Sequence, residues 1–366
     1  MNNGAVKIVI DADIPFIKGV FEKCADVLYL QGSDIAQYLD SLSDREAAQE
    51  HILIIRTRTK CNAATLSGVN VKMIATATIG TDHIDLEYCK SRGIKVASAQ
   101  GCNSAAVMQY VYTSLAALSK IPADRGARGE KVIGVIGAGN VGEKVARLAT
   151  TLGFKVMRND PPKELEQLAD GFKGERLPYY SLEQTLSCSD IVTLHIPLNE
   201  STANMADASF FAKMKSGAIF INTSRGEVVD ETALLAAKGV SDVIIDVWRG
   251  EPKINLALLE RASVATPHIA GYSVEGKENG TTAVVRAVTR FLGIDSLRNF
   301  KVGDADKRHT LYLQPQSSAN ESDITDIPAQ LLSFFPIMEL DKQLRATPQD
   351  FETIRTQYTL RNEFKY

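Results

Sequence analysis

The feature that most restricts the fold of this chain is the run VIGVIGAGNVG at positions 132–142. Its apolar start predicts a buried strand, and the segment EKVARLATTL that follows predicts a helix. Gly137, Gly139 and Gly142 therefore lie in a strand-to-helix turn, where glycine permits a tight turn, a close approach of backbone to a pyrophosphate and close helix packing. The helix N-terminus attracts anions. The run predicts a dinucleotide-binding turn that includes Asn140 and Val141.

The remaining chain continues this alternation of strands and helices. Apolar strands are predicted at 7–10, 52–56, 73–76, 95–97, 132–136, 155–157, 191–195, 218–222, 243–246 and 264–266, and helices at 15–24, 85–92, 103–120 and after 271. Near-continuously apolar strands alternating with helices are typical of parallel sheets covered on both faces. With 366 residues, the chain is long enough for two such domains and a remainder, and the second domain is predicted to begin near the helix at 103–120.

Composition and charge exclude several classes of protein. The 45% hydrophobic and 23% charged residues are typical of an ordinary globular protein. A net charge of -3 provides no global field for nucleic acid or an anionic membrane, so neither partner is expected. Five scattered cysteines without a CxxC pair argue against a disulfide framework and a zinc site, and we expect no metal. The N-terminus lacks leader character, which predicts an unprocessed cytosolic protein.

A carboxylate at the end of the predicted second strand of this domain indicates which cofactor binds. Asp160 follows the strand at 155–157, where it can accept hydrogen bonds from an adenosine ribose and would repel a 2′-phosphate. NAD is therefore favoured over NADP. Arg158 complicates this preference, because on a strand it would share a face with Asp160 and could pair with a phosphate. A solvated strand end is the alternative explanation for Asp160.

Three polar residues fall in loops after predicted strands, where open α/β sheets place their sites: Arg225 in INTSRGEVVD, Glu251 in DVWRGEP and His268 in TPHIAGY. Oxidation of a hydroxy acid needs a base for the hydroxyl proton, and histidine, with an ordinary pKa of about 6.5, suits that role. A nearby Glu251 would favour the protonated imidazole, and Arg225 would bind the substrate carboxylate through its planar fork. Taken singly, each residue also has a structural explanation.

The glycine turn, Asp160 and these three loops, in this order, resemble the D-isomer-specific 2-hydroxyacid dehydrogenases over nearly the first 300 residues. The resemblance implies an α/β fold with two doubly wound parallel-sheet domains: a flavodoxin-like substrate domain (1–101 and 268–303) and a Rossmann NAD domain (102–267), with the active site between them. It also implies that Arg225, Glu251 and His268 are catalytic, and that further residues contact NAD: Ile196, Thr223, Ser224, Asp246 and Gly271.

Within that family, the segments at 55–60, 76–85, 100–111, 159–162 and especially 268–282 are similar to members that act on a small phosphorylated 2-hydroxy acid. This similarity implies oxidation of 4-phospho-D-erythronate to 2-oxo-3-hydroxy-4-phosphobutanoate for pyridoxal 5′-phosphate synthesis, with substrate contacts from Thr57, Thr78 and Tyr272. Arg56, Arg58 and Lys60 would share one face of an extended segment and could meet the phosphate, although Arg58 and Lys60 could equally form a solvated edge.

The C-terminal segment 304–366 is polar, with a predicted strand at 309–313 and helices at 328–340 and 348–363. It has too few apolar residues for a core of its own, so we expect it to dock on a partner surface. The resemblance implies a small α+β dimerisation domain here and a homodimer, although this tail is short for the family. Alternatives remain: another 2-hydroxyacid dehydrogenase, such as one acting on 3-phosphoglycerate, or a noncatalytic NADH-sensing binding protein.

Overall fold

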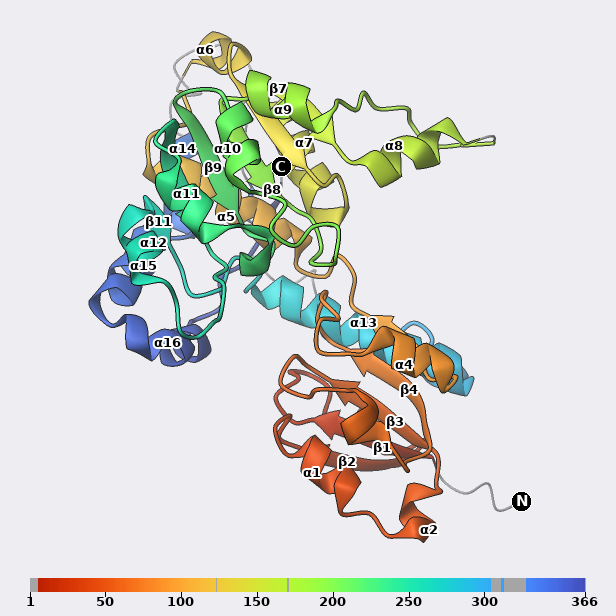
Figure 1. Cartoon of the computed structure of the whole chain (residues 1–366). Helices are drawn as coiled ribbons and strands as arrows, with labels where there is room; N and C mark the ends of the chain where they lie inside the picture. Colours follow the sequence, from red (N-terminus) through yellow and green to blue (C-terminus); the bar gives the residue numbers. More distant parts are fainter. Residues whose placement is uncertain (1–5, 123, 170, 304–310, 313–326, 366) are drawn as a thin grey trace. The chain divides into compact units, whose positions relative to one another are not determined.

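The computed structural model describes residues 6–122, 124–169, 171–303, 311–312 and 327–365 (Figure 1). The described chain forms two compact units. The first runs to Asn103 and includes the segment that begins at Val274, and the second contains Ser104–Ser273 with the described C-terminal residues. These boundaries lie a few residues beyond the expected 101/102 and 267/268, and the functional assignment of the units stays a prediction.

The first unit is built on five parallel strands in the order β2-β1-β3-β4-β5, which is the flavodoxin-like order. Alternate strand residues supply two cores, so that Val9 faces α1, α3 and α4, whereas Ile8 and Ile10 face α13. The elements are β1 (Lys7–Asp11), β2 (Asp26–Leu30), α1 (Ile35–Asp40), α2 (Asp44–Ala47), β3 (His51–Ile55), α3 (Ala63–Leu66), β4 (Val71–Thr76), α4 (Leu86–Ser91), β5 (Lys95–Ser98), α13 (Val274–Leu292) and the 3-10 turn η2 (Asp295–Leu297).

The second unit is built on six parallel strands in the order β11-β10-β9-β8-β6-β7. Tyr179 adds a single parallel bridge to Arg158 on β7, at the position where the Rossmann order has a further strand. The strands are β6 (Val132–Ile136), β7 (Lys155–Asn159), β8 (Ile191–Leu194), β9 (Ala218–Asn222), β10 (Val240–Ile245) and β11 (Val264–Ala265). Both expected sheet types are thus confirmed.

Helices cover both faces of this second sheet. Val135 and Ile221 share a core with α5, α7 and α14, whereas Ile136 and Phe220 share one with α9, α10, α11 and α12. The remaining elements of the unit are α5 (Ser104–Ala117), α6 (Arg125–Gly129), α7 (Asn140–Leu152), α8 (Pro161–Leu168), α9 (Leu182–Cys188), α10 (Ala208–Lys213), η1 (Gly226–Val228), α11 (Glu231–Ala236), α12 (Leu256–Arg261), α14 (Ile327–Phe334), α15 (Ile337–Ala346), η5 (Pro348–Asp350) and α16 (Phe351–Gln357).

The C-terminal residues pack on the second unit of their own chain. Ile327, Leu331 and Phe335 join the core that contains α5 and α7, and Leu344 and Phe351 join the core on the other face. The described tail residues thus pack on their own chain, and the expected docking on a partner and dimerisation stay predictions. β12 (Leu311–Tyr312) pairs in parallel with β13 (Phe364–Lys365); the rest of the strand predicted at 309–313 lies outside the described residues.

Three local predictions are wrong. Segment 15–24 has a helical apolar period but forms consecutive turns, because Phe16 and Gly19 take positive φ angles of 63° and 85° while Ile17 and Phe21 still reach the core. The strand β2 beyond it was not predicted. The single helix predicted at 328–340 is two helices separated at Pro336, and the one at 348–363 ends at Gln357. Among the described helices, none has both the length and the apolar character needed to cross a bilayer.

Candidate active site

The predicted catalytic residues follow three neighbouring strands of the second sheet. Arg225 comes after β9, Glu251 after β10 and His268 after β11, and these strands are adjacent in the order β11-β10-β9. Since the carboxyl ends of parallel strands lie at one edge of a sheet, all three loops emerge at the same edge, next to the glycine turn that follows β6. This is the edge where open α/β sheets bind their ligands.

His268 and Glu251 form a direct pair, with His268 Nδ1 2.8 Å from Glu251 Oε2. The backbone N–H of Trp248 donates to the other carboxylate oxygen at 2.8 Å and fixes its orientation. Burial raises the pKa of the Glu251 carboxyl, but the hydrogen bonds from His268 and Trp248 outweigh burial and hold the pKa below its ordinary value. Glu251 is therefore ionised near neutral pH and leaves His268 Nε2 as the ring nitrogen that can exchange a proton with a ligand.

The backbone around His268 is held in an unusual conformation by Asp246. His268 has a φ of 58°, in the left-handed region, and its N–H donates to the Asp246 carbonyl at 2.7 Å. The Asp246 carboxylate is 1% exposed and accepts from Thr266 Oγ1 at 2.7 Å and from the backbone N–H groups of Ile269 and Ala270 at 2.8 and 2.9 Å. Asp246 thus shapes the loop that carries His268; its expected contact with the nicotinamide stays a prediction.

Arg225 lies in a loop closed by short hydrogen bonds. Asn222 donates its side-chain N–H to the Arg225 carbonyl at 2.9 Å, and Asn222 Oδ1 accepts from the N–H of Ser224 at 3.0 Å. Ser224 Oγ donates to the Leu194 carbonyl at 2.8 Å, which joins this loop to the end of β8. The Arg225 guanidinium is partly exposed and donates to the Ser224 carbonyl at 2.7 Å. Thr223 and Ser224 thus lie between Arg225 and the strand edge.

The glycine turn fits a dinucleotide. Gly137 has a φ of 87°, and a Cβ there would overlap the backbone of His195 and the side chain of Ile196; a Cβ at Gly142 would overlap the Gly137 carbonyl. A Cβ at Gly139, by contrast, would meet no atom within 4 Å. Open space thus lies in front of the N-terminus of α7, beside backbone that approaches closely, as a pyrophosphate requires.

Asp160 caps α8 rather than ending the strand, because β7 ends at Asn159. Its carboxylate accepts from the N–H of Lys163 at 3.0 Å and from the N–H of Ala138, inside the glycine turn, at 2.8 Å. A carboxylate has lone pairs left to accept ribose hydroxyls. Arg158 is 8% exposed and donates to Glu143 at 3.1 Å, so the cation that complicated the NAD preference is already paired inside the protein.

In the first unit, the basic segment after β3 forms a turn instead of continuing as an extended strand. Arg56 donates to the Asp13 carbonyl at 3.3 Å, and Arg58 lies 4.0 Å from the Asp13 carboxylate. Thr57 is exposed, and Thr59 is buried and donates to the Gly32 carbonyl at 2.8 Å. The shared face expected for Arg56, Arg58 and Lys60 is therefore wrong in its geometry, although both arginines still gather at the carboxyl edge of this sheet.

Two other predicted substrate contacts lie on different units. Thr78 follows β4 in the first unit, where its hydroxyl lies 2.7 Å from Thr76 Oγ1, which in turn lies 3.3 Å from His83 Nε2. Tyr272 lies in the second unit, four residues after His268, with its N–H bonded to the Ile269 carbonyl and its ring centroid 6.3 Å from that of Tyr358. Each residue thus lies at or near the carboxyl edge of its own sheet.

Sequence reasoning did not single out two polar residues at these edges. His195 follows β8 and lies 3.0 Å from Thr193 Oγ1 and 3.4 Å from Thr223 Oγ1, and burial lowers its pKa to about 3, so it is neutral in the working range. Asp11 ends β1 and is 1% exposed; burial raises the pKa of its carboxyl. Only their position at a strand end could have pointed to them.

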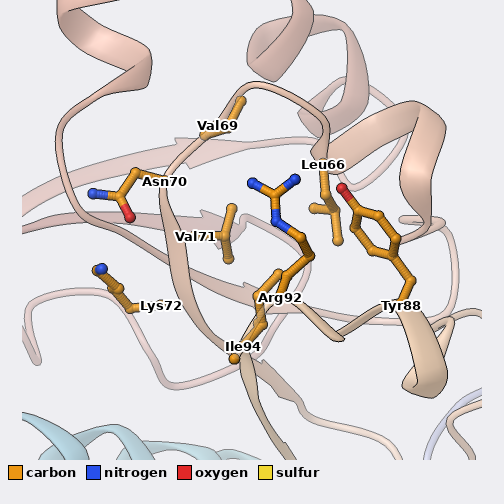
Figure 2. Close-up of a pocket in the computed structure, with 9 residues that line it drawn as sticks. Leu66, Val69, Asn70, Val71, Lys72, Tyr88, Arg92 and Ile94 are labelled. Carbon is orange, nitrogen blue, oxygen red and sulfur yellow. The ribbon is translucent and has the colours of Figure 1, made fainter. Parts of the chain in front are cut away.

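The hollow drawn in Figure 2 lies elsewhere on the first unit. It is lined by the residues that precede or begin β4 and β5, with Tyr88 and Arg92 of the α4 region beside them. These are the amino ends of the strands, at the sheet edge opposite Thr57 and Thr78. The hollow therefore belongs to neither predicted set of ligand contacts.

Residues 122–270 match the family model described as the NAD binding domain of D-isomer specific 2-hydroxyacid dehydrogenases. An erythronate-4-phosphate dehydrogenase of Bacteroides thetaiotaomicron is 40% identical, with 98% of each chain covered. One from Escherichia coli is 38% identical over 79% of this chain and 74% of its own.

Among solved structures, the D-lactate dehydrogenase from Aquifex aeolicus, complexed with NAD and lactic acid, is similar with a TM-score of 0.61. The two sequences are 24% identical, and the match covers 81% of this chain and all of the other. At this level of identity the likeness shows a common fold. This common fold comprises both parallel-sheet units of the chain.

Proposed function

Because the chain belongs to the erythronate-4-phosphate dehydrogenase family of D-isomer specific 2-hydroxyacid dehydrogenases, we propose that it oxidises 4-phospho-D-erythronate to 2-oxo-3-hydroxy-4-phosphobutanoate with NAD. The product is used in pyridoxal 5′-phosphate synthesis. The observation that carries the proposal is the pair of His268 Nδ1 and Glu251 Oε2, 2.8 Å apart at the carboxyl edge of the NAD-binding sheet. The loop with Arg225 follows the neighbouring strand β9.

His268, Glu251 and Arg225 divide the chemical work. His268 Nε2 accepts the proton of the C2 hydroxyl, and Glu251 stabilises the positive charge that the imidazole then carries. Arg225 binds the substrate carboxylate and places C2 in line with the base. Bound NAD supplies the hydride acceptor, and the glycine turn with Asp160 holds its pyrophosphate and adenosine ribose.

The positive charge of the first unit suits the remote phosphate of this substrate. Arg56 and Arg58 both approach Asp13 at the carboxyl edge of the first sheet, and Thr57 is exposed between them. Arg58 has 54% of its side chain exposed and a single carboxylate at 4.0 Å, so a dianionic phosphate would be a stronger partner. We infer that this turn and Thr78 bind the phosphate end and that Tyr272 contacts the same substrate.

We also infer a homodimer formed through the C-terminal region in a cytoplasmic enzyme. The support for both is the family resemblance of the tail and the metabolic place of the reaction. Light scattering of the full chain and of a variant with charged substitutions on the exposed face of α16 tests the dimer. A monomer at micromolar concentration contradicts it.

A substrate panel tests the proposed reaction. The kcat/KM of the purified protein with NAD is measured for 4-phospho-D-erythronate, unphosphorylated D-erythronate and 3-phospho-D-glycerate. We expect kcat/KM for 4-phospho-D-erythronate to exceed that for D-erythronate by at least about 100-fold, because the unphosphorylated acid loses several charge-assisted hydrogen bonds. Preference for 3-phosphoglycerate would make the chain another member of the family. His268→Asn is expected to abolish turnover while NADH still binds; wild-type NADH binding without any turnover would indicate a sensor.

A further inference from the structure

The loop that follows His268 is gripped from two opposite sides by buried charged residues. The Asp246 carboxylate accepts hydrogen bonds from the backbone N–H groups of Ile269 and Ala270. From the other side, the Arg361 guanidinium donates to three carbonyls of the same loop: Ile269 at 3.3 Å, Ala270 at 2.5 Å and Tyr272 at 2.9 Å. Both the donors and the acceptors of these peptide groups are thus engaged, and their orientation is fixed.

Arg361 is itself held rigidly. It is 7% exposed, its guanidinium lies 4.2 Å from the centre of the Phe335 ring, and it donates to Tyr358 Oη at 3.1 Å and to the Ala106 carbonyl on α5 at 2.9 Å. A planar guanidinium stacked on a ring and bonded at both ends of its fork has little freedom left. It therefore links the loop to α5 and to Phe335, which lies between α14 and α15.

His268 needs such support because its conformation is costly. A residue other than glycine in the left-handed region is strained and persists only where its surroundings determine it. Because φ at His268 sets the direction of the Cα–Cβ bond relative to the preceding chain, which carries Glu251, a change in this φ would move Nδ1 away from the carboxylate. Asp246 directly follows β10 in the sequence, whereas Arg361 belongs to the C-terminal segment.

Other contacts of the same segment reach the site. Arg355 Nη1 lies 3.7 Å from Glu251 Oε2, Ser273 Oγ donates to Glu363 at 2.7 Å, and the N–H of Ala265 on β11 donates to Asp341 at 2.8 Å. The tail thus touches the strand before His268, the loop after it and the carboxylate beside it.

We propose that Arg361 is a positioning residue of the active site: the C-terminal segment uses its guanidinium to hold loop 269–272 and, through it, the His268 imidazole against Glu251. This inference rests on the proposed role of His268 as the base. Arg361 would act through the loop and touch neither substrate nor NAD.

The experiment compares Arg361→Met and Arg361→Lys with Arg345→Met as the matched control. Arg345 also belongs to the tail and donates to the carbonyls of Leu259 and Ala262 and to the Asp341 carboxylate, so its contacts lead to β11 and not to loop 269–272. We expect Arg361→Met to lower kcat about 10- to 100-fold, the effect of misplacing a catalytic group by about an ångström. KM for NAD and Kd for NADH should stay within about twofold, because the glycine turn is unchanged. Arg345→Met should lower Tm but leave kcat within about twofold.

A second measurement does not depend on activity. In Arg361→Met, hydrogen exchange of the Ile269 and Ala270 amides should accelerate at least about tenfold, whereas exchange in the glycine turn and in the Arg345→Met protein should not change. Arg361→Lys, with one point charge for several carbonyls, should lie between wild type and Arg361→Met in both measurements.

Several outcomes would overturn the proposal. Unchanged kcat and unchanged loop exchange in Arg361→Met would show that the loop holds itself. A loss of kcat that Arg345→Met reproduces, or that follows the folded fraction and the NADH affinity, would assign Arg361 a purely structural role. If no substrate is turned over by the wild type, the proposed function fails, and the exchange measurement alone still decides whether Arg361 holds the loop.

Discussion

At the scale of single residues, the two carboxylates of the candidate site, Glu251 and Asp246, differ in the groups that surround them. Glu251 receives hydrogen bonds from His268 and Trp248, and it is 17% exposed in its side chain. Asp246 is 1% exposed and accepts hydrogen bonds from Thr266, Ile269 and Ala270; burial raises the pKa of its carboxyl, although the charge of His268 opposes the rise. One carboxylate is therefore placed to stabilise a cation, and the other to shape backbone.

Glu251→Gln should make stability depend less on pH. The folded-state pKa of Glu251 lies below its ordinary value, so its ionised form stabilises the fold above about pH 4.3, and this contribution disappears as pH falls through the lowered pKa. Near neutral pH the variant should lose about 1.5–3 kcal/mol, the value of a hydrogen bond to a charged group. Urea unfolding from pH 7 to pH 3 measures it.

Exposed Glu260→Gln is the control and should leave the curve unchanged. A Glu251→Gln protein as stable as wild type at pH 7 would show that the pair contributes nothing to folding.

His195→Gln should leave the acid limb of the kcat/KM profile where it is in the wild type. Burial keeps His195 neutral down to about pH 3, so it does not change charge between pH 5 and pH 9. Gln can still bond to the neighbouring Thr193 hydroxyl. A pH-rate profile in the oxidation direction measures it; loss of the acid limb in this variant would transfer the role of base from His268 to His195.

At the scale of elements, α5 is the helix on which the second unit depends. It packs against α7 and α14, its Tyr110 hydroxyl lies 2.7 Å from Thr266 Oγ1, and its Ala106 carbonyl binds Arg361. On the same helix, Gln109 is fully buried, and neither its amide nitrogen nor its amide oxygen has a hydrogen-bond partner among the residues that the structure describes. An unpaired buried amide destabilises a fold.

Gln109→Met should therefore stabilise the protein. Removing an unsatisfied buried amide at nearly constant volume should raise the free energy of unfolding by about 1–3 kcal/mol, which calorimetry measures as a higher Tm. Ser114→Ala on the same helix is the control, because its hydroxyl donates to the Tyr110 carbonyl at 2.9 Å, and it should not raise Tm. A lower Tm for Gln109→Met would mean that the amide has a partner in solution, such as water.

At the scale of the whole molecule, the tail completes the second unit. Ile327, Leu331, Phe335 and Ile337 are at most 2% exposed and belong to the core around α5 and α7. Burial of one such side chain is worth about 1.5–3 kcal/mol, so the four together approach the total stability of a typical domain, about 5–15 kcal/mol.

A chain truncated after Val302 should consequently fail to form a stable second unit. We expect exposed apolar surface, seen as binding of a hydrophobic dye, and loss of NADH binding, because the glycine turn lies on the same sheet. Its control is the full chain with Arg345→Met, which keeps the core residues. A truncated protein that binds NADH with wild-type affinity would contradict the role given to the tail.

Local sequence was enough to predict the alternating strands, the tight glycine turn, and the position of Arg225, Glu251 and His268 after successive strands. Each of these depends on short-range properties: the apolar period, glycine's backbone freedom and the order of strands in a parallel sheet. The helix predicted at 15–24 failed because the same apolar period also suits turns that bury Ile17 and Phe21.

Only the tertiary structure decided how the predicted residues are held. Three contacts join residues that no local pattern relates: Arg158 pairs with Glu143, Thr223 Oγ1 lies 3.4 Å from His195 Nδ1, and Arg361 donates to loop 269–272. Arg361 is 92 positions from Ile269, and nothing in the residues around either indicates the other. The sequence alone thus determined which chemical groups reach the sheet edge, while packing determined their orientation, because hydrogen-bond partners in a folded chain are chosen by distance in space.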